Sequence, residues 1–588
     1  MTDFRRELGF TRSEEILLGQ DVKTRRSHYL AMRDLKETSV HVVGAAGFGK
    51  SYFLRSVINQ LIASRQVFGL IDPHRELVEY ALWRLRRSGV RPERIVLLDP
   101  GDSRFSLGFN PLACGVMDPG ETSSLVIDAF QKAWGASSFD QTPRLERTLR
   151  GLFRMLIESR LSLLEGYDVL NPDNVHLRQA LRERVTDRLV QQDWIEFERL
   201  PRTEKVNLVE SSRNRLARVL HAMPLQSMLG QTEGTLDLRD VLDSGKFLLA
   251  NLGSISAPET QRLVGSLLMN GIFHAAKQRD SRRRRSWFLV CDEFGQFATT
   301  DFANSLDQLR KFGVHLVLAH QRLKQLERED PDISSAVMTN CKVKCTFGGL
   351  ERLEAEHMAK ELFTGTVRGD RVKHVSMATK FRPVFGTFNV ETHSESESDS
   401  DSEGWAESDG QSSGTSASDG SSRWMKDEGL TEEDDRVLTN GSSSSQSSRS
   451  NTSSFSGSRG TSRSRGSSRS VVPVTKHIEF QQETGRQFYG LDEEWEDRIS
   501  AVHGLPKREA LVRVYGGPVL HIRTSDIEPE RCDERMERFQ TTVLERCPQV
   551  KTTAVVTHQI EGRRREIAAL AEAKEICGRP FVVRSFRE

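Results

Sequence analysis

Short apolar runs alternate with longer amphipathic stretches along the first two thirds of the chain. Runs that are apolar at nearly every position are typical of strands buried on both faces, as in a parallel sheet covered by helices. Residues 53–62 place their apolar side chains on one helical face. This alternation predicts an α/β domain built from βαβ units. The predicted strands are Val40–Val43, Val67–Asp72, Ile95–Asp99, Lys246–Leu252, Trp287–Asp292, Val314–His320 and Val343–Phe347.

The spacing of strand and helix patterns divides this part of the chain into three segments. Residues 115–240 contain helical patterns only, and strands resume near Lys246. We therefore expect an all-helical subdomain inserted between two halves of one α/β core, residues 1–114 and 241–392.

The remaining chain changes character twice. Residues 393–470 are dominated by Ser, Gly, Asp, Glu and Arg, so we expect a disordered linker with too little apolar surface to offset its ordering entropy. Its first half is acidic and its last third is rich in Ser and Arg, so the basic end either is solvated or contacts nucleic acid or the acidic end. Residues 471–588 predict a small α+β domain with strands at Ala510–Tyr515, at Val519–Arg523 and near Phe581–Val583.

Composition narrows the function classes. The 588 residues include 84 Lys+Arg and 83 Asp+Glu, a net charge of +1, which argues against a uniformly basic DNA-coating protein. The seven cysteines form no Cys-x-x-Cys pair, so a structural zinc site or a disulfide scaffold is not expected. The sequence has no run of 18 apolar residues and no apolar leader, so we expect no transmembrane helix. The predicted location is the cytoplasm, either free or peripheral to the inner membrane through partners.

A glycine-rich loop between the first apolar strand and an amphipathic helix matches the pattern G-x-x-x-x-G-K-[S/T]. In such a loop, backbone N–H groups surround the β-phosphate of a nucleotide, the lysine contacts the β/γ oxygens and the hydroxyl ligates Mg²⁺. The alternative, a glycine turn with a solvated lysine, does not explain the strand and helix on either side. The predicted nucleotide-binding residues are Gly44, Ala45, Ala46, Gly47, Phe48, Gly49, Lys50 and Ser51.

Asp292 and Glu293 follow the apolar run Trp287–Cys291. Beside a phosphate loop, Asp292 is expected to hold Mg²⁺ and Glu293 to orient and polarise the attacking water. Alone, the pair also fits a strand end with two solvated acids.

Three further features have two interpretations each. Gln321, after the strand Val314–His320, is either a sensor of the γ-phosphate or a loop residue. Arg310 is either a solvated helix residue or an arginine that reaches the γ-phosphate of a neighbouring subunit. The run Arg282–Arg285 is either a solvated loop or a DNA contact.

The order of several motifs resembles the TraG/TraD-type coupling ATPases, members of the HerA/FtsK superfamily associated with conjugation and type IV secretion. The resemblance covers roughly residues 15–390 and includes the helical insert. Two of its motifs, DPH after the second strand and FNPL after the third, are not general phosphate-loop features. The motifs that carry it are HVVGAAGFGKS, LIDPHRELVEYAL, IVLLDPGDSRFSLGFNPL, FLVCDEFGQFAT and LAHQ.

The resemblance implies a RecA-like P-loop ATPase that uses ATP and Mg²⁺ and moves single- or double-stranded DNA through a ring, usually a homo-hexamer. Its catalytic roles carry over to Lys50, Glu293, Arg310 as a finger acting in trans and Gln321, and its metal ligands to Ser51 and Asp292. The implied partners are a secretion complex or a relaxase. Asp72 and His74 lie at the nucleotide-facing end of the second strand without an assigned role.

Three departures and three alternatives stay open. Ala46 and Phe48 stand where the family often has Thr and Ser, DPHGD reads DPHRE, and the transmembrane helices of many coupling proteins have no counterpart. One alternative is a HerA-like ATPase that works with a nuclease in DNA processing or defence. The others are a secretion ATPase acting on protein and a nucleotide-switch scaffold.

Overall fold

The computed structural model describes residues 14–113, 117–135, 143–282, 284–324, 326, 331–367, 371–400, 416–424, 460–530 and 533–572. The chain divides into two compact units. Unit 1 consists of Met1–Val367 and Asp492–Glu588, and unit 2 consists of the intervening Arg368–Leu491. The strand predicted near Phe581–Val583 lies outside the described residues.

An eleven-stranded sheet forms the centre of unit 1, in the order β2-β1-β15-β14-β10-β3-β9-β8-β4-β7-β5. The strands from β10 to β5 run parallel, which confirms the predicted α/β fold with a mostly parallel central sheet. Antiparallel strands extend the sheet beyond β10. The bounds are β1 (Glu15–Asp21), β2 (Ser27–Ala31), β3 (Val40–Val43), β4 (Val67–Asp72), β5 (Ile95–Leu98), β7 (Phe247–Asn251), β8 (Trp287–Cys291), β9 (Val314–His320), β10 (Val343–Phe347), β14 (Glu509–Val514) and β15 (Leu520–Arg523).

Helices cover both faces of the sheet, as the alternating side chains of β8 illustrate. Phe288 and Val290 belong to one buried cluster, together with residues of α3 and α4. Leu289 and Cys291 belong to a second cluster, together with residues of α5, α14 and α15. Burial on two faces is why these strands are apolar at nearly every position. The covering helices of unit 1 include α2 (Met32–Glu37), α3 (Lys50–Ala63), α4 (Glu76–Arg87), α5 (Pro119–Trp134), α14 (Pro258–Lys277), α15 (Thr300–Leu309), α17 (Pro331–Asn340) and α18 (Arg352–Phe363).

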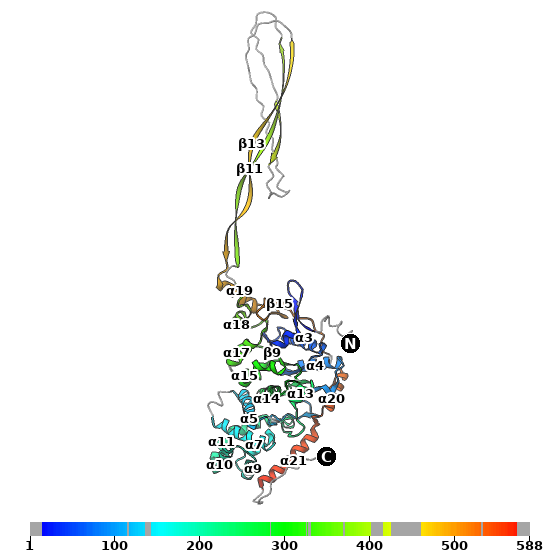
Figure 1. The fold of residues 1–588 in the computed structure, drawn as a ribbon, viewed down its shortest axis with the longest axis vertical. Helices are drawn as coiled ribbons and strands as arrows, with labels where there is room; N and C mark the ends of the chain where they lie inside the picture. Colours follow the sequence, from blue (N-terminus) through cyan, green and yellow to red (C-terminus); the bar gives the residue numbers. More distant parts are fainter. Residues whose placement is uncertain are drawn as a thin grey trace. The chain divides into compact units, whose positions relative to one another are not determined.

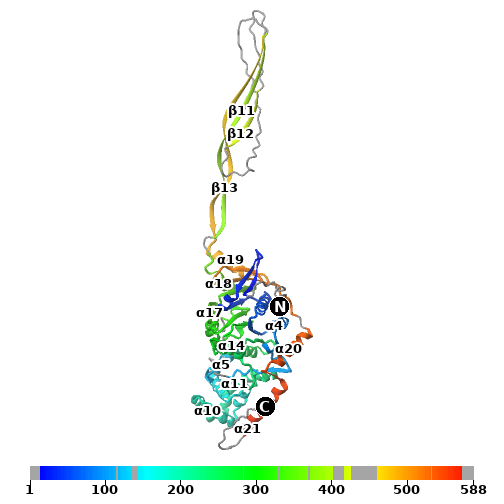
Figure 2. The ribbon, with the colours of Figure 1, turned by 45° about the vertical axis from the view of Figure 1, so that its right-hand side comes forward.

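A group of helices follows β5 and precedes β7, as predicted for the insert. Its helices pack on one another and on α14, and their apolar residues are continuous with the second cluster of the sheet. In Figures 1 and 2, these helices gather at one end of unit 1, and α18 lies toward the other end. Besides α5, the helices are α7 (Pro143–Glu158), α8 (Leu163–Val169), α9 (Val175–Arg182), α10 (Arg188–Arg199), α11 (Arg202–Leu220), α12 (Met223–Leu229) and α13 (Leu238–Ser244).

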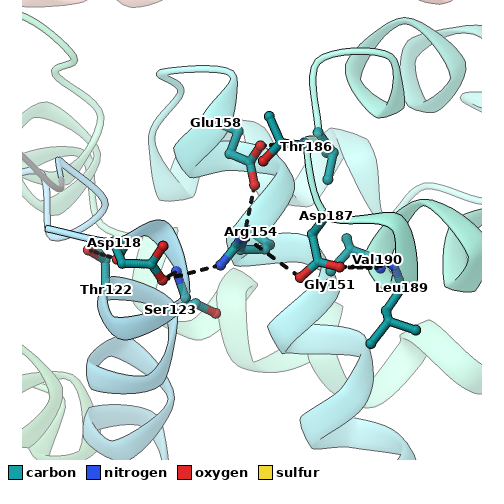
Figure 3. Close-up of polar contacts among 12 residues, drawn as sticks. Asp118, Thr122, Ser123, Gly151, Arg154, Glu158, Thr186, Asp187, Leu189 and Val190 are labelled. Carbon is teal, nitrogen blue, oxygen red and sulfur yellow. Dashed lines mark hydrogen bonds and ion pairs between the residues drawn. The ribbon is translucent and has the colours of Figure 1, made fainter.

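Arg154 of α7 joins two helix starts inside this group (Figure 3). Asp118 caps α5 and Asp187 caps α10, each by accepting backbone N–H bonds. The Arg154 guanidinium lies 3.6 Å from Asp118 and 3.8 Å from Asp187, and its Nε donates to Glu158 at 2.9 Å. One half-buried cation therefore holds two capped helix ends against the same helix.

The predicted separate carboxy-terminal domain, residues 471–588, is wrong. Strand β14 pairs antiparallel with β10, and β15 pairs with both β14 and β1, so this segment completes the central sheet. A parallel sheet that ends at β10 exposes a row of unpaired N–H and C=O groups, which a returning strand satisfies. The preceding helix, α19 (Leu491–His503), contributes Ile499 and Val502 to a buried cluster with α18.

The last two helices extend across unit 1. Helix α20 (Glu534–Arg546) packs beside α4, β5 and the turn η1 (Pro92–Arg94), and α21 (Thr553–Glu572) packs on α9 and α12 of the insert. The short strand β16 (Val550–Thr552) between them pairs with β6 (Phe105–Leu107). In α21, Arg563 Nε lies 2.7 Å from the carboxylate of Glu165, which is 1% exposed.

Unit 2 is a three-stranded antiparallel sheet in the order β12-β11-β13. The predicted disordered linker, residues 393–470, is wrong for residues 393–400, 416–424 and 460–470, whose backbone forms strands. Residues 393–400 pair antiparallel with residues 460–467, and just before them Glu391 lies opposite Arg469 and forms an ion pair with it. Opposite charges directly across a strand pair stabilise the pairing. The strands are β11 (Val372–Ser400), β12 (Ser416–Trp424) and β13 (Gly460–Phe488), and the other residues of the predicted linker lie outside the described ranges.

Within the described ranges, every helix is too short or too polar to cross a lipid bilayer.

Candidate nucleotide-binding site

The phosphate loop lies between β3 and α3, at the carboxyl edge of the parallel strands. Gly49 precedes α3 with φ of 118°, a conformation that favours glycine. Gly44 packs so closely on β10 that an added Cβ would lie 2.5 Å from Phe347 Cβ. The Ser51 side chain is exposed in the first turn of α3. The loop therefore has the backbone conformation and the helix start that an anion-binding loop requires.

Lys50 is the buried cation of this loop, with 6% of its surface exposed. Its Nζ donates to the carbonyl oxygens of Gly44 at 2.6 Å and Ala45 at 3.3 Å. Burial lowers the pKa of Lys50, and the carboxylates of Glu293 and Asp292 oppose that shift. The structure thus brings together the lysine and the acidic pair that the sequence predicted.

The acidic pair follows β8, with Asp292 6% and Glu293 3% exposed. Burial, together with the neighbouring Glu293 and Asp72, raises the pKa of Asp292 to about 7. Glu293 has φ of 50°, which is costly for a residue with a side chain and fixes where its carboxylate lies. The alternative of two solvated acids at a strand end does not fit this burial.

His74 joins the acidic pair, a grouping that sequence spacing did not reveal. One ligand atom each from His74, Asp292 and Glu293 lies within 4.8 Å of the others, close enough to hold one metal ion. Oxygen and imidazole donors of this kind suit a divalent cation. The parallel register of β4 with β8 explains the grouping, because it pairs Ile71 with Cys291 and so aligns the residues that follow both strands.

Asp72 has a local structural role. Its carboxylate accepts the backbone N–H groups of His74, Leu77 and Val78 at 2.7, 2.8 and 3.1 Å, which holds the start of α4. Burial raises the pKa of Asp72, and these three hydrogen bonds oppose that shift. Asp72 therefore positions His74 through the DPH turn.

Gln321 lies beside the phosphate loop. The register Val43↔His320 between β3 and β9 aligns Gln321 with Gly44, and its side chain is half-buried. Next to it, His320 Nε2 lies 2.6 Å from His41 Nε2, inside the sheet.

Arg310 lies at the opposite edge of the sheet, in the turn η3 (Arg310–Phe312) before β9. Its Nη1 donates to the carbonyl oxygen of Glu37 at 2.8 Å. The seven residues of β9 separate it from Gln321, which at a strand rise of about 3.3 Å per residue is roughly 20 Å. Arg310 is therefore outside the reach of the phosphate loop of its own chain.

The arginine run before β8 lies at that same amino edge. The guanidinium of Arg284 donates to the carbonyl oxygens of Arg279 and Lys311. Arg283 lies outside the described residues. The contacts of Arg284 are those of a side chain that fixes a turn, whereas Arg282 and Arg285 are exposed, so the choice between a solvated loop and a DNA contact stays open for them.

The carboxy-terminal segment before β14 rests on the phosphate loop, a contact that the sequence did not predict. Arg508 N–H donates to the carbonyl oxygen of Phe48 at 2.8 Å. A Cβ added to Gly49 would lie 3.0 Å from the Cα of Arg508. More than 450 residues separate the two segments in sequence, so local patterns carry no signal for this contact.

Residues 287–404 match the family model described as "TraM recognition site of TraD and TraG". The resemblance to TraG/TraD proteins is confirmed over these residues. The matched range begins with β8 and includes Asp292, Glu293, Arg310 and Gln321.

Solved structures of coupling proteins and of VirB4 are similar to the chain. The unbound monoclinic form of the bacterial conjugative coupling protein TrwBdeltaN70 has a TM-score of 0.47 and 13% identity, over 90% of this chain and 93% of that one. The plasmid coupling protein TrwB in complex with ADP and Mg²⁺ has a TM-score of 0.49 and 12% identity, over 85% and 89%. VirB4 of Thermoanaerobacter pseudethanolicus has a TM-score of 0.43 and 13% identity, over 60% and 88%. No curated protein matches the chain.

Proposed function

We propose that the chain is a Mg²⁺-dependent ATPase that assembles into a homo-hexameric ring and moves DNA in conjugative transfer or mobilisation. The observation that carries this proposal is the meeting of Lys50 with Asp292 and Glu293 at one sheet edge. A buried lysine on a glycine loop, near two buried carboxylates that follow the second strand along the sheet, is the arrangement that phosphoryl transfer needs.

In this proposal each residue of the site has one task. The N–H groups of residues 44–51 and the ammonium of Lys50 hold the phosphates, so Lys50 exchanges its loop carbonyl partners for phosphate oxygens. Glu293 orients the attacking water and accepts its proton, and Gln321 contacts the γ-phosphate from β9.

The donor set fits a bound Mg²⁺. Ser51 and Asp292 would hold the ion, and a ring nitrogen of His74 lies within 4.8 Å of the carboxylates of Asp292 and Glu293. Bound Mg²⁺ neutralises charge on the transferred phosphate. Two buried carboxylates side by side are costly without a cation, as the raised pKa of Asp292 indicates.

The position of Arg310 supports the proposal that several copies form a ring. An arginine at the amino edge of the sheet does not reach its own nucleotide, so a role at a γ-phosphate requires a neighbouring copy. The matched family model, described as a TraM recognition site of TraD and TraG, supports the resemblance to TraG/TraD-type proteins. DNA transfer as the task, and a relaxase or secretion complex as the partner, are what that resemblance implies.

The test is ATP hydrolysis by the full chain, with and without single- or double-stranded DNA, together with the mass of the assembly. We expect DNA to stimulate turnover and Lys50→Ala to abolish it. Lys246→Ala, which removes a lysine paired with Asp240 at the far edge of the sheet, is the matched control. A rate that DNA leaves unchanged would contradict the motor and favour a secretion ATPase or a nucleotide switch acting on protein.

A further inference from the structure

Strand β3 leads into the phosphate loop and has different strands on its two sides. Strands β9 and β8 lie on one side of β3 and carry Gln321 and the acidic pair. Strands β10 and β14 lie on the other side. Because β14 runs antiparallel to β10, with Ala510 opposite Phe347, the start of β14 lies at the same carboxyl edge as the loop. The residue that enters β14 there is Arg508.

Arg508 is held against the loop by its backbone. Its N–H binds the Phe48 carbonyl, and its own carbonyl accepts from the backbone N–H of Thr524 at 2.9 Å. It has φ of 68°, a left-handed conformation that costs a residue with a side chain of order 1 kcal/mol or more. Glycine would relieve that strain, so the strain points to a use for the arginine side chain.

The guanidinium of Arg508 lies beside the first turn of α3. It stacks on the ring of Tyr52, 4.9 Å from the ring centre, directly after Ser51. Tyr52 is 43% exposed and the Arg508 side chain 25% exposed, so both face solvent at the loop.

The carboxylate of Asp526 balances the positive charge of the Arg508 guanidinium. Asp526 Oδ1 lies 2.6 Å from Arg508 Nη1, and its side chain is 93% exposed. An exposed carboxylate of this kind contributes little net stability, and a phosphate group can replace it as the anion that faces the guanidinium.

We propose that Arg508 binds the α-phosphate and nucleoside end of the nucleotide in cis, and that Asp526 competes with the nucleotide for the Arg508 guanidinium. This proposal rests on the proposed function. In the proposed function Glu293 and Gln321 act at the γ-phosphate from the ends of β8 and β9, so the other end of the nucleotide would leave the loop toward β10 and β14. A cation stacked beside the first turn of α3 is placed to meet it there.

The test measures binding of ADP and of a non-hydrolysable ATP analogue, with Mg²⁺, to the full chain by calorimetry. Arg508→Gly is the first variant, because glycine suits the positive φ and keeps the backbone N–H that binds Phe48. We expect its affinity to fall about tenfold or more for both nucleotides, since a hydrogen bond to a charged group is lost. Its thermal unfolding should match that of the unmodified chain.

Asp526→Asn removes the competing carboxylate, so it should raise the affinity for both nucleotides severalfold. The double variant Arg508→Gly/Asp526→Asn should bind like Arg508→Gly alone, because Asp526 acts only through the arginine. Arg513→Ala is the matched control, since Arg513 lies farther along β14 and donates to the carbonyl oxygens of Glu361 and Gly516. It should leave both affinities unchanged.

Two results separate the failures. Suppose that Arg508→Gly and Asp526→Asn both bind the nucleotides like the unmodified chain while Lys50→Ala does not bind them. Arg508 then only supports the loop through its backbone, and this proposal is overturned. If the unmodified chain binds neither nucleotide, the proposed function itself fails.

Discussion

The His41–His320 pair shows how burial controls a single side chain beside the site. Both rings are buried, with His41 Nε2 facing His320 Nε2, and His320 Nδ1 lies 3.1 Å from the carbonyl oxygen of Arg322. Burial lowers the pKa of His320 to about 4, and burial with the neighbouring His320 lowers that of His41 well below its usual value. Two rings that share one hydrogen bond in a sheet stay neutral.

We therefore predict an acid-sensitive core. Below pH 6.5 the unfolded chain protonates these histidines while the folded chain does not, so stability falls as the pH falls toward 4. The free energy of unfolding should drop by about 1.4 kcal/mol per pH unit for each such ring. Urea unfolding at pH 7.0, 6.0 and 5.0 measures the slope. His41→Gln, which does not titrate, should lower the slope by about the share of one ring, and an unchanged slope would show that this pair is not its source.

At the scale of single elements, ion pairs add to the apolar packing that joins the helices of the insert. Arg154, whose side chain is 14% exposed, links the capped ends of α5 and α10 (Figure 3). Arg147, on the same helix, pairs with Asp193 at a 66% exposed position. The two arginines therefore differ mainly in burial.

We predict that Arg154→Ala lowers the free energy of unfolding by about 2 kcal/mol, because three carboxylates lose a partly buried cation. Arg147→Ala should cost less than about 1 kcal/mol, as exposed ion pairs do. The midpoints of urea unfolding, monitored by helical circular dichroism, measure the difference. Equal costs would mean that Arg154 contributes no more than a surface pair.

At the scale of the whole molecule, unit 2 is an insertion whose removal is simple to design. Val372 and Phe488 are cross-strand partners, so the two ends of the insertion meet. We predict that replacing residues 375–486 by a short Gly/Ser linker leaves ATP hydrolysis without DNA unchanged, because the site residues belong to unit 1. The rate of the shortened chain, compared with the full chain, tests this. A loss of hydrolysis with intact folding would assign unit 2 a role in the nucleotide site.

Assembly of several copies would complete the nucleotide site, because Arg310 of one copy would act at the site of its neighbour. Arg310→Ala and Glu293→Gln should each remove most activity, by about 100-fold or more, because each lacks one half of a site shared between copies. Mixed before assembly, the two variants should regain part of it, since Glu293→Gln copies still supply Arg310 to the Arg310→Ala copies. Hydrolysis across mixing ratios measures the recovery. A mixture no more active than its components would make Arg310 a solvated turn residue.

The sequence alone predicted the features that depend on neighbouring residues. The phosphate loop with Lys50, the apolar strands and the acids after β8 are encoded within a few residues each, because strand burial and loop conformation are local properties. The helical insert was predicted for the same reason. These features place Asp292 and Glu293 at a strand end, and the parallel register brings them to Lys50.

Only the tertiary structure decided how distant segments pair. Strand β14 completes the sheet beside β10 and brings Arg508 to the phosphate loop, although composition suggested a separate domain. Residues 393–400 pair in register with residues 460–467, although composition suggested disorder. In both cases the partner strand lies far away in sequence, so no local pattern specifies it.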